Sequence, residues 1–162
     1  MNIAPATVDM VYLVAADMRD EDFREISATR NTIDKEELAR QMALNCSKRG
    51  EKLYAVGDET PIAIVGVLPL WPGVWSATMF ATDELDKIGK ELTKFAYKVI
   101  MPSVFRANPN RIECRSIDGH TKAQKWIEFM GLKYENTNRN FGKNGEDFHT
   151  YAWVAGDPVW GV

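Results

Sequence analysis

Apolar residues recur along the chain with two periods, one typical of strands and one typical of helices. Residues 10–18, MVYLVAADM, form a β-branched and aromatic run that predicts a first strand. Residues 52–70 predict two strands joined by a turn at 57–60, and the nearly continuous apolar run at 62–68 indicates a strand covered on both faces. Residues 74–82 predict the next strand of the same meander. We therefore expect the strand at 62–68 to lie near the centre of a sheet.

Two helices are predicted between the first strand and this meander. Asp20 stands where it can cap a short helix. Asp34, with Glu37 three residues later, resembles a capping box that opens a second helix, and the helical run ends at Gly50. The chain therefore begins with a strand followed by two helices.

Two further helices are predicted in the second half of the chain. Asp83 stands at the N-cap of the first, and Pro102 ends or kinks it. Its apolar stripe, which faces a sheet, consists of Leu85, Ile88, Leu92, Phe95 and Val99. Asp118 can cap the second over about 120–130, and Gly131 stands where a left-handed helix cap belongs.

The remaining strands complete a single domain. Residues 111–116, RIECRS, alternate between apolar and charged side chains, and 132–137 and 147–154 predict a closing antiparallel pair. The order β-α-α-β-β-β-α-β-α-β-β predicts an α/β (mixed α+β) fold with one central, mixed, mostly antiparallel sheet flanked by helices. We expect a domain over 1–154 and a C-terminal tail over 155–162.

Charge and composition exclude several classes of function. The formal net charge is −3, from 20 basic and 23 acidic residues without a basic block, so nucleic acid is not an expected partner. No apolar run approaches the roughly 20 residues that span a bilayer, and the N-terminus lacks the pattern of a signal peptide. We expect a protein of the cytoplasm with no membrane partner. Cys46 and Cys114 lack metal-ligand spacing, and the two histidines, His120 and His149, are too few for a histidine-based metal site. We therefore expect no metal.

The C-terminal half carries a resemblance to a known family. The stretch at 111–136 follows the long helix, and within it IEFMGLKYE places Gly131 and Leu132 where a Gly-Phe pair ends the last helix of the Gcn5-related N-acetyltransferase (GNAT) superfamily. The chain resembles this superfamily in pattern over roughly 9–154, and within it the acetyltransferase-like proteins of short-tailed bacteriophages. The resemblance implies transfer of an acetyl group from acetyl-coenzyme A to an amine of a small molecule or a protein, with the cofactor lodged where two parallel strands splay apart.

The resemblance also implies a set of cofactor-binding residues. The family's phosphate loop reads Arg or Gln, two residues, Gly, one residue, then Gly or Ala, and these positions fall here on Glu84, Lys87 and Gly89, so that one glycine is kept. Glu84 repels a diphosphate, whereas lysine side chains supply positive charge. The same segment is also explained as a capped helix with acidic residues in its first turn. The implied contacts are Met79, Phe80 and Ala81 on the strand edge and Lys87, Ile88, Gly89 and Lys90 in the loop.

Two residues are candidates for a catalytic role. Asp83 and His120 are the candidate proton carriers, although both positions are equally those of helix caps or surface residues. Ile127 occupies the place where the family often has a tyrosine acid, and it has no proton to donate. A rival interpretation is therefore a protein that kept the fold and lost the reaction, such as a binding or assembly module in a bacteriophage accessory or virion protein. Trp160 in the tail either anchors a protein partner or packs back on its own domain.

Overall fold

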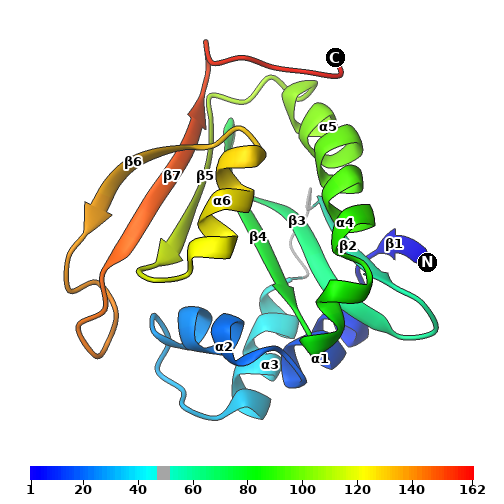
Figure 1. The fold of residues 1–162 in the computed structure, drawn as a ribbon, viewed down its shortest axis with the longest axis vertical. Coiled ribbons are helices and arrows are strands. Elements are labelled where there is room, and N and C mark those ends of the chain that lie inside the picture. The colour runs from blue at the N-terminus through cyan, green and yellow to red at the C-terminus, as the bar shows by residue number, and fades with distance from the viewer. Residues whose placement is uncertain (47–51) are drawn as a thin grey trace.

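The structure is a computed structural model that describes residues 1–46 and 52–162. Over these residues a seven-stranded sheet has the order β1-β2-β3-β4-β5-β7-β6 (Figure 1). Neighbouring strands are antiparallel apart from β4 and β5, which are parallel. The strands are β1 (Asn2–Pro5), β2 (Lys52–Gly57), β3 (Pro61–Trp71), β4 (Val74–Ala81), β5 (Arg111–Ile117), β6 (Lys133–Asn138) and β7 (Phe148–Val154). The predicted mixed, mostly antiparallel sheet is confirmed.

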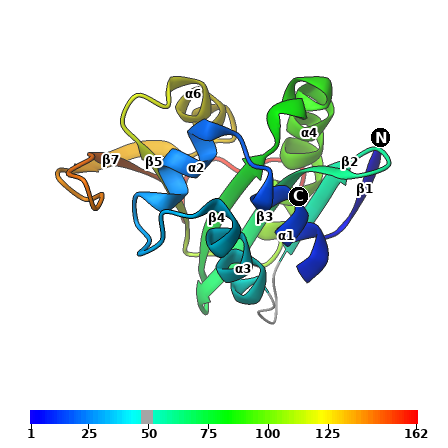
Figure 2. The same cartoon turned by 90° about the horizontal axis from the view of Figure 1, so that it is seen from below.

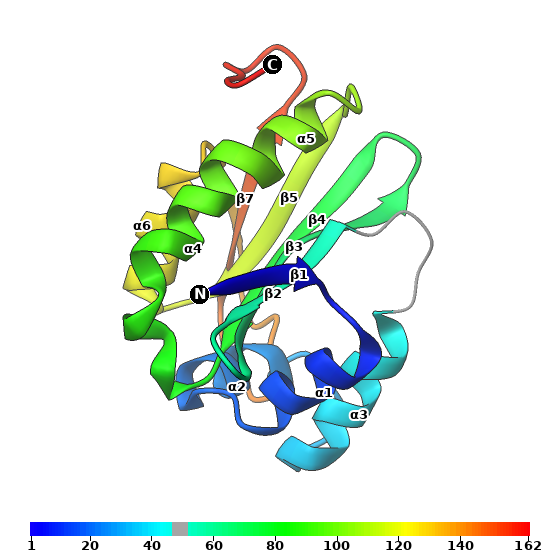
Figure 3. The same cartoon turned by 90° about the vertical axis from the view of Figure 1, so that its right-hand side faces the viewer.

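Helices cover both faces of the sheet (Figures 2 and 3). On one face lie α1 (Val8–Ala16), α2 (Asp20–Ser27) and α3 (Lys35–Asn45). On the other face lie a 3₁₀ turn (Asp83–Lys87), α4 (Gly89–Phe95), a π-helical segment (Ala96–Ile100), α5 (Met101–Phe105) and α6 (Thr121–Phe129). None of the helices among the described residues combines the length and the apolar character needed to cross a membrane.

Strand β3 lies between two apolar layers, as predicted. Val65 and Val67 pack in the core under α4–α6, whereas Ile64 packs in the core under α1 and α3. Because successive side chains of a strand point to opposite faces, both faces of β3 bury apolar surface. This strand anchors β4, which pairs with it over most of its length.

The predicted strand at 10–18 is wrong: most of this segment is helix α1, and the first strand is Asn2–Pro5. The buried residues Val11, Val14 and Ala15 follow helical spacing, and Leu13 between them is 55% exposed. Thr7 caps the helix by accepting the Met10 N–H. The β-branched composition suggested a strand, but burial against α3 and β3 requires the helical period.

Helix caps agree with the sequence in part. Asp34 caps α3 as predicted, accepting the N–H groups of the second and third helical residues. Thr82, rather than Asp83, caps the 3₁₀ turn after β4, and its hydroxyl accepts the Glu84 N–H at 3.3 Å. The expected end of the second helix at Gly50 lies outside the described residues. Since Thr82 is the last residue before the turn, its extended backbone places the hydroxyl over the first amides.

Pro102 does not end the long helix. The Met101 N–H bonds to the Ala96 carbonyl, five residues back, and helical structure continues to Phe105. This π-helical turn accommodates the missing proline N–H and changes the phase of the helix. Val99, predicted to belong to the buried stripe, is consequently 44% exposed.

The C-terminal tail returns to the domain. The Trp160 ring stacks on Tyr97 with centroids 4.8 Å apart, and its Nε1–H donates to the Tyr97 carbonyl at 2.8 Å. A Cβ at Gly131 would lie 2.6 Å from this ring. Gly131 also has a φ of 92°, the left-handed cap that the sequence predicted. Of the two alternatives for Trp160, the structure therefore supports packing on its own domain.

Candidate functional site

Strands β4 and β5 are paired over a short distance and then diverge (Figure 1). Among the described residues their parallel pairing covers Val74–Ser76 of β4 and Arg111–Glu113 of β5. Both strands continue beyond this point, β4 to Ala81 and β5 to Ile117. The backbone edges of both strands are thus turned toward a gap in the middle of the sheet.

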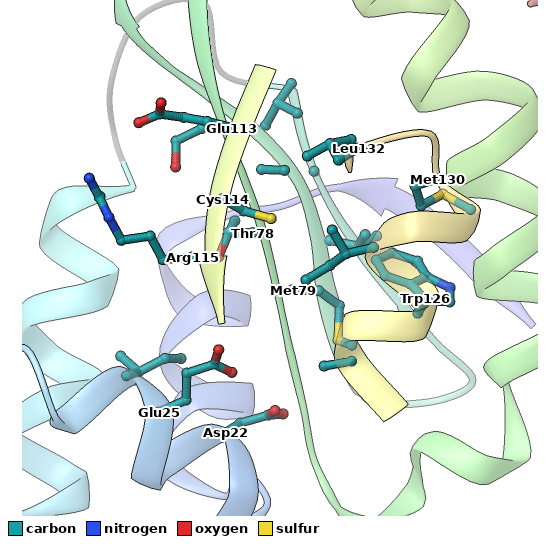
Figure 4. Close-up of a pocket in the computed structure, with 18 of the residues that line it drawn as sticks. Asp22, Glu25, Thr78, Met79, Glu113, Cys114, Arg115, Trp126, Met130 and Leu132 are labelled. Carbon is teal, nitrogen blue, oxygen red and sulfur yellow. The ribbon is translucent and has the colours of Figure 1, made fainter. Parts of the chain in front are cut away.

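Helix α2 bridges the wide end of this splay with two carboxylates (Figure 4). Asp22 Oδ2 accepts the Ala81 N–H of β4 at 2.9 Å, and Glu25 Oε1 accepts the Ile117 N–H of β5 at 2.9 Å. Residues three apart share one face of a helix, so a single turn of α2 reaches both strands. These bonds could not be predicted from local sequence patterns, because the partners are 59 and 92 residues apart in the chain.

Asp22 is 2% exposed and its charge is compensated. Arg19 donates to its two oxygens at 2.8 and 3.0 Å, in a bidentate pair. A buried carboxylate is stable only with such partners, and losing one of them is costly. The bridge between the strands is therefore a fixed part of the fold.

A cavity of about 430 Å³ occupies the splay. We call the side formed by 96–101 and α6 its helical wall. This wall is largely apolar and includes Ile100, Trp126 and Met130. The polar wall of the cavity, formed by α2, Thr29, Arg30 and Phe141, includes Glu25. Figure 4 shows Cys114 of β5 on the side of α6, with Glu113 and Arg115 on the opposite side. The cavity therefore reaches both faces of the sheet.

His120 lies at the edge of this cavity and pairs with Glu25. The two atoms Nδ1 and Oε2 are 2.8 Å apart, and both side chains are partly buried. The hydrogen bond to Glu25 raises the pKa of His120, although burial opposes the shift. His120, predicted to be a proton carrier, thus lines the cavity, and that role stays a prediction. Its partner Glu25 is not indicated by the sequence.

Comparison with solved structures identifies the fold. A ribosomal-protein-alanine N-acetyltransferase from Brucella melitensis matches with a TM-score of 0.68 and 13% identity, over 95% of this chain and 99% of that chain. The aminoglycoside 6′-N-acetyltransferase from Enterococcus faecium matches with a TM-score of 0.64 and 12% identity, over 95% and 97%. A protein from Chromobacterium violaceum ATCC 12472, named as a probable GNAT-family acetyltransferase, matches with a TM-score of 0.67 and 15% identity, over 94% and 86%.

The chain has the GNAT acetyltransferase fold. No protein-family model matches the sequence, and the comparison with curated proteins found no match. The resemblance to the GNAT superfamily stated from the sequence is confirmed at the level of structure, and the narrower resemblance to bacteriophage proteins stays a prediction.

The three residues predicted to contact the cofactor on the GNAT strand edge lie in different surroundings. Met79 lines the cavity. Phe80 is 1% exposed and packs in the core beneath α1 and α3, and the Ala81 N–H is held by Asp22. Their roles stay a prediction, but Met79 is well placed for contact with a ligand, with Thr78 beside it in the cavity lining.

The predicted phosphate loop of the GNAT fold is partly engaged within the protein. Lys87 Nζ pairs with Glu84 Oε1 at 2.9 Å, and Ile88 is buried in the core. Asp83 and Lys90 are exposed. A Cβ built at Gly89 meets no atom within 4 Å, so the surface over the start of α4 is open. The site roles of these residues stay untested.

The Cys114 thiol and a cluster of two carboxylates and a histidine are two further candidates for chemistry in the cavity. Burial raises the pKa of the Cys114 thiol to about 12, so it is protonated at neutral pH and is a poor nucleophile. Asp22, Glu25 and His120 each offer a metal-ligand atom, all within 4.8 Å of one another. The two carboxylates already accept hydrogen bonds from Arg19, the Ala81 and Ile117 amides and His120. Protein groups therefore satisfy this cluster without an ion.

Proposed function

We propose that the protein is an acetyl-coenzyme A dependent N-acetyltransferase that acetylates an amine of a small molecule or a protein. The observation that carries the proposal is the cavity in the β4–β5 splay, which reaches both faces of the sheet. An acyl carrier lying along the helical wall and an amine arriving from the polar wall would meet in the gap between the strands. A volume of about 430 Å³ lies within the range of small-molecule sites, roughly 300–1,000 Å³.

The backbone of β4 supplies a hydrogen-bond donor to this gap. Successive N–H groups of a strand point to opposite edges of that strand. The Thr82 N–H points to β3, whereas the Ala81 N–H points to α2. Two residues earlier, the Met79 N–H therefore also points into the splay, beyond the last pair with β5. Acetyl-coenzyme A, when bound, supplies an activated thioester carbonyl. Donation from Met79 N–H to that oxygen would stabilise the charge that develops as an amine attacks.

The pair of Glu25 and His120 can accept the proton of the amine. With Nδ1–H donated to Glu25, the neutral ring keeps Nε2 as an acceptor. A C–N bond forms as the C–S bond breaks, and the amine proton passes to Nε2. Because Ile127 carries no proton, the leaving thiolate would be protonated by water. Glu25 orients the ring and stabilises its protonated form.

A second candidate is a binding module that has this fold without the reaction, such as a bacteriophage accessory or virion protein. Two observations favour it. The Lys87 ammonium is paired with Glu84, and Ile127 lacks the proton of the family's tyrosine. A module of this kind would keep the cavity without turnover.

Calorimetry with acetyl-coenzyme A tests the proposal. We expect binding that stabilises the fold by about 2.7 kcal/mol at 100 times the dissociation constant. Ala77→Phe, which places a ring in the cavity, should abolish binding, and Glu59→Phe, in the exposed turn between β2 and β3, should leave it unchanged. No binding by the unaltered chain would contradict the proposal.

Transfer is measured separately with a panel of amines. His120→Gln should lower kcat by roughly 10² to 10⁴, the usual contribution of acid–base catalysis. Tight binding of acetyl-coenzyme A without acetylation of any amine would favour the binding module instead.

A further inference from the structure

The carboxylates on the lining of the cavity are all paired. Each is within hydrogen-bond distance of a positively charged group or of histidine, so none of them presents a free negative charge to a ligand. The pairs are Asp22 with Arg19, Glu25 with His120, and Glu113 with Arg111.

Two arginines on the same lining have no such compensation. Arg30 and Arg115 are exposed, and within 1–46 and 52–162 no ion pair or hydrogen bond engages either guanidinium. The Arg115 guanidinium lies over the Phe141 ring, 5.2 Å from its centroid. A guanidinium stacked on a ring keeps its N–H edge available for an acceptor. Both cations therefore face solvent and the cavity without an anion.

The two arginines are held on one side of the cavity. Arg115 projects from β5 on the side opposite Cys114 (Figure 4). Residues 28–32, which contain Arg30, are tied to the loop carrying Phe141, because Lys143 Nζ donates to the carbonyls of Arg30 and Thr32 at 3.2 and 2.9 Å. We call the side of the cavity that carries Arg30 and Arg115 its rim.

We propose that the acceptor is a small amine that carries a carboxylate or phosphate at its other end, bound by Arg30 and Arg115. The inference rests on the proposed function and concerns its polar wall. Guanidinium groups recognise carboxylate and phosphate oxygens through paired N–H donors. With the anion held on this rim, the amine end points toward His120 and the splay. Polyamines and basic peptides are disfavoured by the same charges.

Matched acceptors test the inference, because they differ only at the end remote from the amine. ω-Amino carboxylic acids are compared with ω-amino amides of equal chain length, and aminoalkyl phosphates with amino alcohols. We expect kcat/KM to be at least tenfold higher for the anionic member of a pair. The two series distinguish carboxylate from phosphate as the preferred anion. Equal rates within both series, or faster acetylation of a peptide without acidic residues, would overturn the inference.

Substitutions of the two arginines test whether they cause the preference for anionic acceptors. Arg30→Gln and Arg115→Gln should each lower kcat/KM for anionic acceptors about tenfold more than for neutral acceptors. Arg40→Gln, on the exposed surface of α3 and paired with Glu36, is the matched control and should change neither. A double variant that keeps the preference would overturn the assignment of these two residues.

Binding of reaction products provides a readout that needs no turnover. N-Acetylated ω-amino acids and the matching amides are titrated by NMR into the protein saturated with coenzyme A. The anionic products should bind at least fivefold more tightly, and the double variant should abolish the difference. Equal binding, including none for either product, would overturn the inference.

The same variants separate this inference from the proposed function. Failure of acetyl-coenzyme A to bind the unaltered chain refutes the proposed function itself. Normal binding without preference for anionic acceptors refutes only the inference. A loss of acetyl-coenzyme A affinity in Arg30→Gln or Arg115→Gln would assign the two guanidinium groups to the phosphates of the carrier, and would overturn the inference as well.

Discussion

The two walls of the cavity differ in what holds them together. The helical wall is built from apolar side chains such as Ile100 and Met130, which belong to the larger core cluster. The polar wall is built from charged side chains of α2, held by hydrogen bonds to strand ends. An apolar wall tolerates small changes of shape, whereas the buried carboxylate of Asp22 on the polar wall depends on every partner. The polar wall is therefore the part of the site that is more sensitive to single substitutions.

The strongest test of this comparison is the loss of Asp22. Asp22→Ala leaves Arg19 without its carboxylate and the Ala81 N–H without an acceptor. We expect a loss of about 3–5 kcal/mol in the free energy of unfolding, measured by urea denaturation. Asp20→Ala, in the same helix but fully exposed, is the control and should change stability by less than about 0.5 kcal/mol. Equal effects of the two variants would show that the bridge is not needed.

A bulky residue at Gly89 tests the start of α4. A Cβ at this position meets no atom within 4 Å beyond its chain neighbours and the backbone of its own helix, so we expect Gly89→Val to fold. If phosphates approach this turn, the valine should weaken acetyl-coenzyme A binding about tenfold, equivalent to about 1.4 kcal/mol. Gly89→Ala, with a smaller side chain, should have a smaller effect in the same calorimetric titration. Unchanged affinity in both variants removes this turn from the site.

Breaking the ion pair between Glu84 and Lys87 should have a smaller effect on the affinity for acetyl-coenzyme A. Glu84→Gln should free the lysine and remove a repulsive charge, so acetyl-coenzyme A should bind more tightly, whereas Lys87→Ala should bind it more weakly. Both side chains are more than half exposed, so each change should be at most about 1 kcal/mol, or roughly fivefold. Affinity that stays constant in both variants would contradict a role for this pair in binding.

The smallest effect concerns the charge of His120. Glu25 raises its pKa above 6.5, so the pair stabilises the fold when the ring is protonated, and this contribution is lost as pH rises through the folded-state pKa. Stability should therefore fall slightly above pH 6.5, and Glu25→Gln should remove that slope. Proton NMR of the imidazole, assigned with His149→Gln, should show a lower pKa for His120 in Glu25→Gln. An unchanged pKa would contradict the coupling.

Local patterns predicted the fold well, and contacts distant in sequence decided the site. The cap at Asp34, the left-handed Gly131 and the doubly covered strand at 62–68 all depend on neighbours within a few residues. The segment 10–18 was misassigned because its composition suits a strand while its burial follows α1. Glu25 was missed because its partners, Ile117 and His120, follow it by 92 and 95 residues. No short-range period carries such information.

The return of the tail has a practical consequence for producing shortened forms of the protein. A recombinant chain stopped at the predicted boundary, residue 154, would lose Trp160 and uncover the rings of Tyr97 and Phe105. Newly exposed aromatic surface of this kind promotes aggregation. Val162, by contrast, is 67% exposed, so an affinity tag fused after the last residue should leave the packing of the indole intact.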